Sequence, residues 1–175
     1  MTVLWIIAGT VALLFIAAIF MRRNHYEECN IVIEASNSKV FDFVKLVANQ
    51  EAFNKHAQAG TDRQKTITGT DGTVGFIYAW NGSKEAGQGE KEIIAIEEGR
   101  RIETEIRFVK PMVVSSRMVM ETQALPDGNT QVTWSNAGDL KYPLNLLIPF
   151  MEKSVTKDMQ GSLVMLKELL EGDNR

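Results

Sequence analysis

The amino-terminal segment constrains this chain more than any other feature. Residues 2–21, TVLWIIAGTVALLFIAAIFM, contain no charged side chain, and only Thr2 and Thr10 are plainly polar. As a helix, about twenty residues rising about 1.5 Å each extend about 30 Å, which matches the hydrocarbon thickness of a bilayer. A helix also satisfies its own backbone N–H and C=O groups, as a lipid environment demands. The sequence therefore predicts one transmembrane helix over residues 2–21.

A cleaved signal peptide is the alternative for this segment. Such a peptide has a basic start, a shorter apolar stretch and a small-x-small cleavage site. Here no Lys or Arg precedes the apolar run, and the small pair Ala17–Ala18 lies inside it, so an uncleaved anchor is favoured. The positive-inside rule then places Arg22, Arg23 and everything after them on the cytoplasmic side. The single cysteine, Cys29, suits a reducing compartment.

Composition separates this anchor from a globular remainder. The 175 residues are 45% hydrophobic and 23% charged, which is typical of a folded domain. Taking Arg22 and Arg23 from the 19 basic residues leaves 17 against 22 acidic ones, so we expect no nucleic-acid partner and no general basic patch for anionic lipid. Residues 1–26 are expected to form the anchor and a short tether, and residues 27–175 one domain held close to the membrane.

The globular part is predicted to begin with one strand and two short helices. Residues 27–34 alternate apolar and polar side chains as a strand does. A helix follows, with an N-cap at Ser36 or Asn37 and an apolar stripe at helical spacing, made of Val40, Phe41, Val44 and Val47. Residues 49–56 predict a second short helix, with Phe53 as its one large apolar contact.

From residue 63 the apolar period changes to two, as in β-strands. Turn pairs at Asn81–Gly82 and Asp127–Gly128, and a proline at 111, separate runs that predict about six antiparallel strands. From Pro143 to about Leu170 the helical spacing returns, with a stripe made of Met151, Val155, Met159, Leu163, Leu166 and Leu170. We expect this stripe to pack on the inward face of the sheet.

Four stretches carry a resemblance to a known superfamily. They are IVIEASNSKVFDFV at 31–44, GTVGFIYAWNG at 72–82 with GQGE at 87–90, QVTWS at 131–135, and GSLVMLKELLE at 161–171. In order and spacing the chain resembles the START-like, or SRPBCC, superfamily, and within it the polyketide cyclase/dehydrase branch, whose members often carry one N-terminal membrane helix. Residues 49–58 depart from that branch, because Phe53 is their only aromatic where members often have tryptophan and proline.

The resemblance implies an α+β helix-grip fold. In that fold a curved antiparallel sheet of about seven strands wraps a long C-terminal helix and commonly leaves a cavity between them; here one transmembrane helix would precede it. The superfamily shares no universal catalytic set, so the resemblance transfers no active-site residue.

The inward strand faces and the helix stripe are expected to line such a cavity. Apolar walls with a few polar groups are typical of small-molecule sites, and flexible methionines suit varied ligands. Ser116 and Asn136 are expected as further polar contacts. The alternative is that the same side chains only fill a solid core. The residues expected to bind a ligand are Phe76, Tyr78, Trp80, Ile94, Thr104, Ile106, Met118, Met120, Trp134, Met151, Val155 and Met159.

Few residues indicate catalysis. Tyr78 and Glu90 are the candidates for moving protons, and Glu90 qualifies only if the strand face that it shares with Glu92 points inward. Carboxylates on a solvated outer face are the commoner case. No metal or nucleotide motif is present, and we expect no metal and no cofactor, because the imidazole and thiol side chains stand at no ligand spacing: His25, Cys29 and His56.

Three functions remain open at this point. The leading one is a membrane-anchored domain that takes a hydrophobic small molecule or lipid into its cavity. The second is an enzyme similar to cyclase or dehydrase members of the superfamily. The third is a scaffold with a filled core that binds a protein partner. The presence of a cavity, and of ionisable groups on its wall, distinguishes them.

Overall fold

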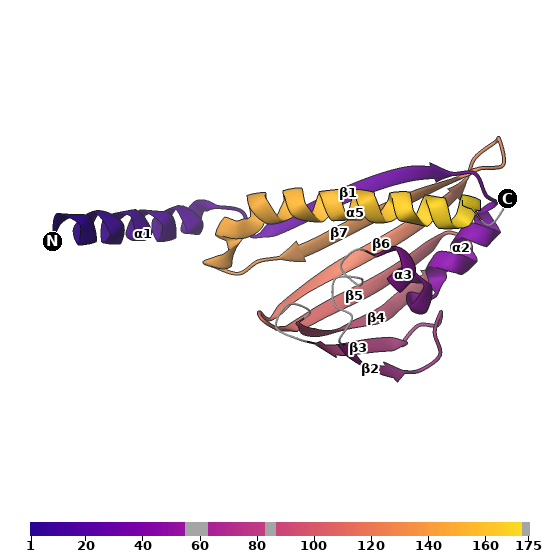
Figure 1. Ribbon diagram of the computed structural model, residues 1–175, viewed down its shortest axis with the longest axis horizontal. Coiled ribbons are helices and arrows are strands. Elements are labelled where there is room, and N and C mark those ends of the chain that lie inside the picture. Colours follow the sequence, from indigo (N-terminus) through magenta and orange to yellow (C-terminus); the bar gives the residue numbers. More distant parts are fainter. Residues whose placement is uncertain (55–62, 83–86, 173–175) are drawn as a thin grey trace.

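The computed structural model describes residues 1–54, 63–82 and 87–172. Along the described chain one helix precedes a strand, two short helices, six further strands and a long final helix, as the sequence predicts (Figure 1). The elements are α1 (Thr2–Phe20), β1 (Asn24–Ile33), α2 (Asn37–Lys45), α3 (Val47–Phe53), β2 (Arg63–Thr68), β3 (Ile77–Gly82), β4 (Gln88–Glu97), β5 (Arg101–Lys110), β6 (Val114–Ala124), β7 (Thr130–Asp139), the 3₁₀ helix η1 (Leu144–Leu147) and α5 (Ile148–Gly172).

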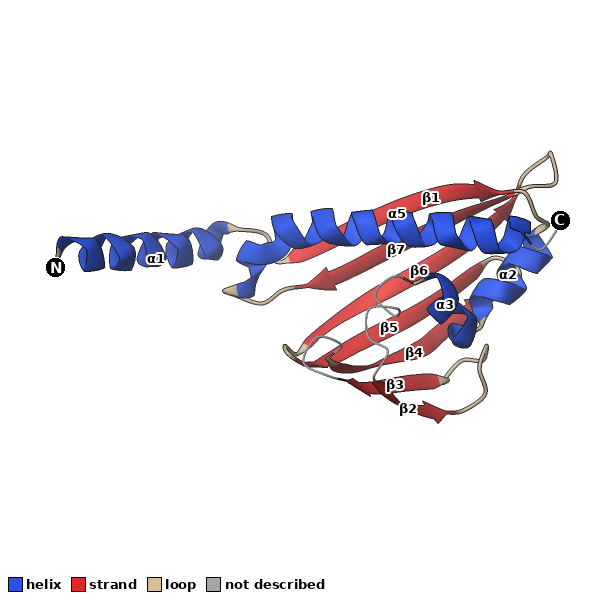
Figure 2. Ribbon diagram, viewed as in Figure 1, coloured by secondary structure: helices blue, strands red, loops and turns tan. Residues whose placement is uncertain are grey.

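All seven strands form one antiparallel sheet in the order β1-β7-β6-β5-β4-β3-β2. Each strand from β2 to β7 pairs with its neighbour in sequence, whereas β1 pairs with β7, so that Cys29 lies opposite Trp134. The helix α5 runs along the sheet beside β1 and β7, and α2 and α3 lie at the other end of the strands from α1 (Figure 2). This arrangement is the α+β helix-grip fold, and that prediction is confirmed.

The core forms where α5 meets the sheet. The stripe predicted on this helix is buried from Met159 through Leu163 and Leu166 to Leu170, whereas Met151 and Val155, nearer the start of the helix, are half-buried. Phe53 from α3 packs edge-on against Trp134 from β7, with their ring centroids 6.3 Å apart. The stripe is therefore fully covered over the second half of α5 and only partly covered over the first half, where the helix still contacts β1 through Cys29 Sγ, 3.6 Å from the carbonyl oxygen of Thr156.

The helix α3 begins two residues before the predicted position. Its first N–H groups are capped by a side chain distant in sequence, because Asp71 accepts hydrogen bonds from the backbone of Val47 at 2.8 Å and of Ala48 at 2.9 Å. Free N–H groups at a helix start need such a partner. A cap supplied from another segment leaves no local trace in the sequence.

The first strand also begins earlier than predicted, at Asn24 rather than at residue 27. The expected alternation is present, but the inward positions hold His25 and Glu27, whose polarity hid the pattern. Consequently the link between α1 and the sheet is shorter than the tether expected over residues 22–26. Only Met21, Arg22 and Arg23 separate the two elements.

The end of α1 is held by the segment that joins β7 to α5. Asn145 Nδ2 donates hydrogen bonds to the carbonyl oxygens of Ala18 at 2.6 Å and Met21 at 3.2 Å. Leu140 N–H donates to the carbonyl of Arg23 at 2.7 Å. The helix α1 is long and apolar enough to cross a membrane, and its side chains are almost all exposed.

A bulge in β4 overturns one prediction for the inward face. Ile93 pairs with Thr104 and Ala95 with Glu103, so Ile94 has no direct partner across β5. The extra residue shifts the alternation of the strand. Ile93 is therefore fully buried in the core, and Ile94, which was expected to face inward, does not belong to it.

We expect Leu163→Ala to lower the free energy of unfolding by about 3 kcal/mol, because it removes a side chain with no exposed surface from the contact between α5 and the sheet. Val164→Ala is the matched control one position along, where 42% of the side chain is exposed, and should cost well under about 1 kcal/mol. Chemical unfolding of the full chain in detergent gives both values. Equal losses would contradict the assigned face of α5.

Candidate functional site

A cavity of about 380 Å³ lies between the sheet, α3 and α5. Its walls come from α5 between Met151 and Ser162, from α3, and from the inward faces of β1 and β3–β7. A volume of this size exceeds what a few water molecules fill and lies within the range of small-molecule sites. The interior is therefore not the solid core of the scaffold alternative.

Eight of the twelve residues expected to bind a ligand line this cavity. They come from four strands and from α5, and most are apolar: Tyr78, Trp80, Ile106, Met118, Trp134, Met151, Val155 and Met159. The expected polar contacts Ser116 and Asn136 lie on the same wall.

The other four lie elsewhere. Phe76, Met120 and Thr104 are buried in the interior but do not line the cavity, and Ile94 is the bulge residue of β4. Met118 lines the cavity, and Met120, two residues along the same face, does not. Strand alternation predicts which face a side chain is on, but not how far along the strand the cavity extends.

Two glycines allow large side chains to lie close to the sheet beside the cavity. A Cβ atom on Gly89 would stand 2.7 Å from the ring of Trp80, and one on Gly138 would stand 2.7 Å from Nε2 of His25. Any larger residue would displace the ring above it. Gly89 and Gly138 therefore leave the space that the rings of Trp80 and His25 occupy on the wall.

Lys91 is a buried amine on the cavity wall that the sequence reasoning missed. It lies on the inward face of β4 with 7% of its surface exposed, and Nζ donates a hydrogen bond to Gln50 Oε1 at 2.9 Å. Gln50 is itself held by the carbonyl of Val44 at 2.8 Å. Burial lowers the pKa of Lys91 to about 8, and the negative charges of Glu51 and Asp71 oppose that shift. Near neutral pH the cavity thus holds an amine close to its titration point.

Tyr78 is joined to α3 beside this lysine. Its hydroxyl donates a short hydrogen bond to Glu51 Oε1, and Lys65 Nζ lies 2.6 Å from the other oxygen of that carboxylate. Burial, followed by the hydrogen bond to Glu51, raises the pKa of Tyr78. The hydroxyl therefore stays protonated at neutral pH and acts as a hydrogen-bond donor.

A second polar cluster lies at the end of the cavity nearer α1. His25 Nδ1 lies 3.0 Å from Glu27 Oε1, and Asn136 Nδ2 donates to Glu27 Oε2 at 2.8 Å. His25 and Glu27 are both buried, and His25 and Asn136 both line the cavity. His25 and Glu27 stand two residues apart on β1. In the sequence, this spacing was the one sign that both face the inside of the sheet. The cavity therefore has these two polar clusters on opposite sides, Asp158 and Ser162 of α5 on its wall, and mostly apolar side chains elsewhere.

Glu90, the second candidate for proton transfer, is not on the cavity. Even-numbered residues at the start of β4 face the outer side of the sheet, where Arg107 Nε donates to Glu90 Oε1 at 2.7 Å. Arg107 also bonds Glu92 and Glu105, and these contacts raise its pKa. The condition set for Glu90, an inward-facing strand face, is not met, and the prediction for this residue is wrong.

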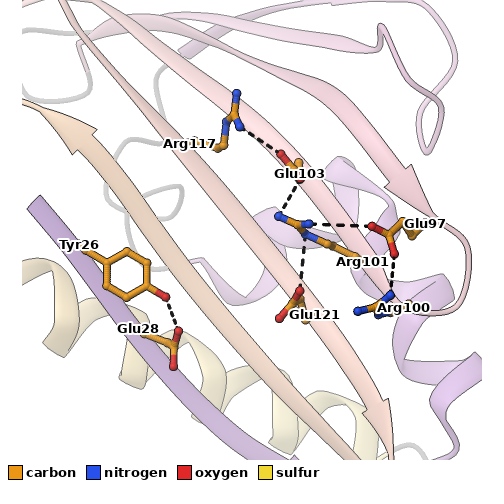
Figure 3. A network of polar contacts seen from close by, with 8 residues as sticks. All are labelled: Tyr26, Glu28, Glu97, Arg100, Arg101, Glu103, Arg117 and Glu121. Carbon is orange, nitrogen blue, oxygen red and sulfur yellow. Dashed lines mark hydrogen bonds and ion pairs between the residues drawn. The ribbon is translucent and has the colours of Figure 1, made fainter. Parts of the chain in front are cut away.

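The outer face of the sheet carries a second set of ion pairs (Figure 3). Arg101 lies at its centre, with Glu103 at 2.7 Å and Glu121 at 3.5 Å. Tyr26 donates to Glu28 on β1, on the same face. These charges satisfy one another on a solvated surface, as is common for exposed strand faces.

No group of three or more His, Cys, Asp or Glu side chains suited to a metal ion occurs among the described residues. His25 is engaged with Glu27, and Cys29 is a free, buried thiol whose pKa is raised by burial. His56 lies outside the described residues.

A curved antiparallel sheet that grips a long helix over an apolar cavity defines a protein of the Bet v 1-like, START-like class. The chain belongs to the family described as "Polyketide cyclase / dehydrase and lipid transport", which matches residues 28–171. Membership of this family supports the binding of hydrophobic ligands in general. No curated protein matches the sequence closely enough to count as a relative.

Solved structures share the fold at low sequence identity. Ara h 8.0201 is 17% identical with a TM-score of 0.63, over 85% of this chain and 99% of that one. Truncated norcoclaurine synthase from Thalictrum flavum is 10% identical with a TM-score of 0.65, over 86% and 95% of the two chains. The same enzyme in complex with dopamine and hydroxybenzaldehyde is 12% identical with a TM-score of 0.63, over 86% and 89%. At these identities the likeness shows the fold alone.

Replacing Lys91 with Met tests the buried amine. The unfolded chain keeps the ordinary lysine pKa of 10.5, whereas the folded chain has about 8. Between these values the unfolded chain binds more protons, so the stability of the wild type rises with pH in this window, and at lower pH the buried amine costs about 3 kcal/mol. The difference in unfolding free energy, Lys91→Met minus wild type, should therefore fall by about 2 to 3 kcal/mol between about pH 7 and about pH 10.

Urea unfolding of both full-length proteins in detergent at the two pH values gives this difference. Comparing the two pH values isolates the part of the difference that depends on the protonation of Lys91, because the change in packing on substitution is the same at both. A difference that does not change with pH would show that Lys91 is not desolvated.

Proposed function

We propose that this protein is a single-pass membrane protein whose domain binds a hydrophobic small molecule or lipid between α5 and the sheet. The observation that carries the proposal is the cavity of about 380 Å³, whose walls are mostly apolar and carry a few polar groups. Family membership supports the same class of ligand. An apolar ligand gains about 25 cal/mol for each Å² of its apolar surface removed from water, before the costs of association.

The wall residues suggest how such a ligand lies. Met118, Trp134 and Met159 offer apolar surface in the middle of the cavity, and Lys91 lies on the wall toward α3. An ammonium group has three N–H donors, and Gln50 accepts one of them. Lys91 therefore favours a ligand whose apolar body ends in an oxygen-bearing head, such as a carboxylate or a carbonyl.

The anchor and its orientation complete the proposal. The helix α1 has 19 residues and a mean hydropathy of 2.7 over its most apolar window, as membrane-spanning helices do. Arg22 and Arg23 follow it directly, and the positive-inside rule puts them, with the domain, in the cytoplasm.

Filling the cavity tests ligand binding. Val155→Trp places a large side chain into the cavity from α5, and Thr156→Trp places the same side chain on the exposed face of the helix one position along. Native mass spectrometry of the full chain, released from detergent micelles, should show a bound small molecule on the wild type and on Thr156→Trp. The adduct should be lost from Val155→Trp, because its place is taken.

An adduct that persists on Val155→Trp would place the ligand outside the cavity. The absence of any adduct on the wild type, together with no change in Tm on adding a long-chain fatty acid or a prenyl alcohol, would remove the basis of the proposal.

A second function, catalysis, is favoured by one observation. An amine with a pKa of about 8 beside a neutral tyrosine hydroxyl is suited to proton transfer or to attack on a carbonyl group at neutral pH. Tyr78 is the sequence-predicted candidate that lies on the cavity, and Lys91 is its neighbour across β3 and β4. No particular substrate follows from this pair.

Reductive trapping measures the reactivity of that amine. In the presence of benzaldehyde, Nζ of Lys91 should attack the carbonyl carbon and release water to form an imine, which sodium borohydride reduces to a stable secondary amine. At about pH 8 about half of Lys91 is unprotonated, whereas the hydrogen bond to Glu51 raises the pKa of Lys65. Peptide mapping should therefore find Lys91 modified well ahead of Lys65. Equal labelling of the two would argue against a reactive amine.

A further inference from the structure

We propose that the end of the domain nearest α1 rests in the surface of a lipid bilayer, and that the cavity exchanges its ligand with that bilayer there. The contact surface is an apolar rim, made of Val109, Met112 and Val113 at the β5–β6 turn and of Leu147 and Phe150 at the start of α5. The inference rests on the proposed membrane span of α1 and adds an interaction surface to it.

Among the described residues that follow α1, the two most exposed large apolar side chains belong to the rim. Val113 is 86% and Phe150 78% exposed, and the other three also lie at the surface. An exposed cluster of large apolar side chains on a soluble surface is a mark of an interaction site.

The strand register places both parts of the rim at one end of the sheet. Phe108 pairs with Val114 across the β5–β6 turn. Two residues further along β6, Ser116 pairs with Gly138 of β7, and Gly138 pairs with His25 at the start of β1. The β5–β6 turn therefore lies at the same end of the sheet as the start of β1 and the end of β7. Figure 1 shows this turn and the start of α5 on the side of the sheet from which α1 departs.

The opposite end of the sheet differs in its chemistry. The β6–β7 turn there contains Asp127, Gly128 and Asn129, and the β4–β5 turn contains Glu98 and Arg100. The β5–β6 turn at the end near α1 is therefore apolar, whereas these two turns at the other end are polar. This asymmetry follows the position of the anchor, as a surface that meets lipid requires.

The attachment of α1 fixes which surface meets the bilayer. Three residues separate α1 from β1, and Asn145 bonds the last turn of α1 to the segment just before Leu147. The ring of Phe15 in α1 also packs edge-on against Tyr142, with their centroids 6.1 Å apart. With α1 across a bilayer, the segment between β7 and α5 lies at the interface, and Leu147 and Phe150 lie with it.

Charged side chains at this end suit the headgroup region. Lys110 and Lys141 are exposed on the two segments that carry the rim, and Arg22 and Arg23 follow α1. The acidic groups nearby are Glu152, which pairs with Arg22 at 2.6 Å, and Asp139. Apolar side chains flanked by cations are typical of segments that lie in a membrane interface. The sequence as a whole carries no basic excess, so this feature is local.

The rim is continuous with the wall of the cavity. Phe108 and Val114 both line the cavity and flank the β5–β6 turn, and Met151 lines it directly after Phe150 in sequence. Phe108 is partly exposed and packs edge-on against Trp80, with their centroids 5.6 Å apart. An apolar ligand that leaves the lipid at the rim therefore meets apolar side chains along its path into the cavity.

Depth-dependent quenching in a bilayer tests the contact. The full chain, with Cys29 replaced by Ser, is given one cysteine by Val113→Cys at the rim or by Asp127→Cys at the opposite end as the control. Each is labelled with an environment-sensitive fluorophore and placed in nanodiscs of phosphatidylcholine and phosphatidylglycerol. Spin-labelled lipid should quench the fluorophore at 113 severalfold and leave that at 127 unchanged.

Each outcome separates this inference from the proposed function. A fluorophore at 113 that is no better quenched than the one at 127, in a chain that resists extraction by alkaline carbonate, would overturn the rim contact and leave the anchor intact. Extraction of the chain by carbonate would instead overturn the proposed membrane span, and the rim contact with it.

A rate measurement tests the exchange of ligand. The full chain carrying Trp5→Phe, in nanodiscs, is mixed with vesicles containing cis-parinaric acid, and energy transfer from Trp80 and Trp134 reports its entry into the cavity. Val113→Asp should slow entry severalfold without changing the final level, whereas Val74→Asp, at an exposed valine near the opposite end, should leave the rate unchanged. Equal rates for wild type and both variants would contradict exchange through the rim.

Discussion

The packing of α5 against the sheet is the contact on which the rest of this structure depends. Over its second half the helix presents Leu163, Leu166 and Leu170 to the strands, and these side chains are buried. Over its first half Met151 and Val155 are only partly covered, and both line the cavity. The same apolar stripe thus stabilises the fold at one end and lines a cavity at the other. The position of the cavity follows from where the stripe is no longer fully covered.

The polar groups of the cavity lie where the surrounding elements can hold them. Lys91 and Tyr78 are held by Gln50 and Glu51 of α3, and His25 is held through Glu27 by Asn136 of β7. Burial of a charged group is tolerated only with such partners. A core that served stability alone would have apolar side chains at these positions, because burying polar groups lowers stability. Buried polar groups on the cavity wall are therefore expected of a binding site.

The sequence predicted the order of elements and the stripe on α5, because both follow from hydrophobic periodicity. It placed Met118 and Trp134 on the cavity for the same reason. It failed where an inward position is polar, as at His25 and Lys91, since the alternation of a strand is read from apolar residues. It also failed at Ile94, where a bulge shifts the pattern, and at the start of α3, whose cap comes from Asp71. Partners distant in sequence decide such features.

A crystal structure of the full chain, grown from a lipid phase without added ligand, tests the central claim most directly. The account predicts continuous density for a bound molecule between Val155 and Trp134, with its polar end within hydrogen-bonding distance of Lys91 Nζ. A cavity closed by α5 lying flat on the strands, with Met151 and Met159 filling the space, would contradict it.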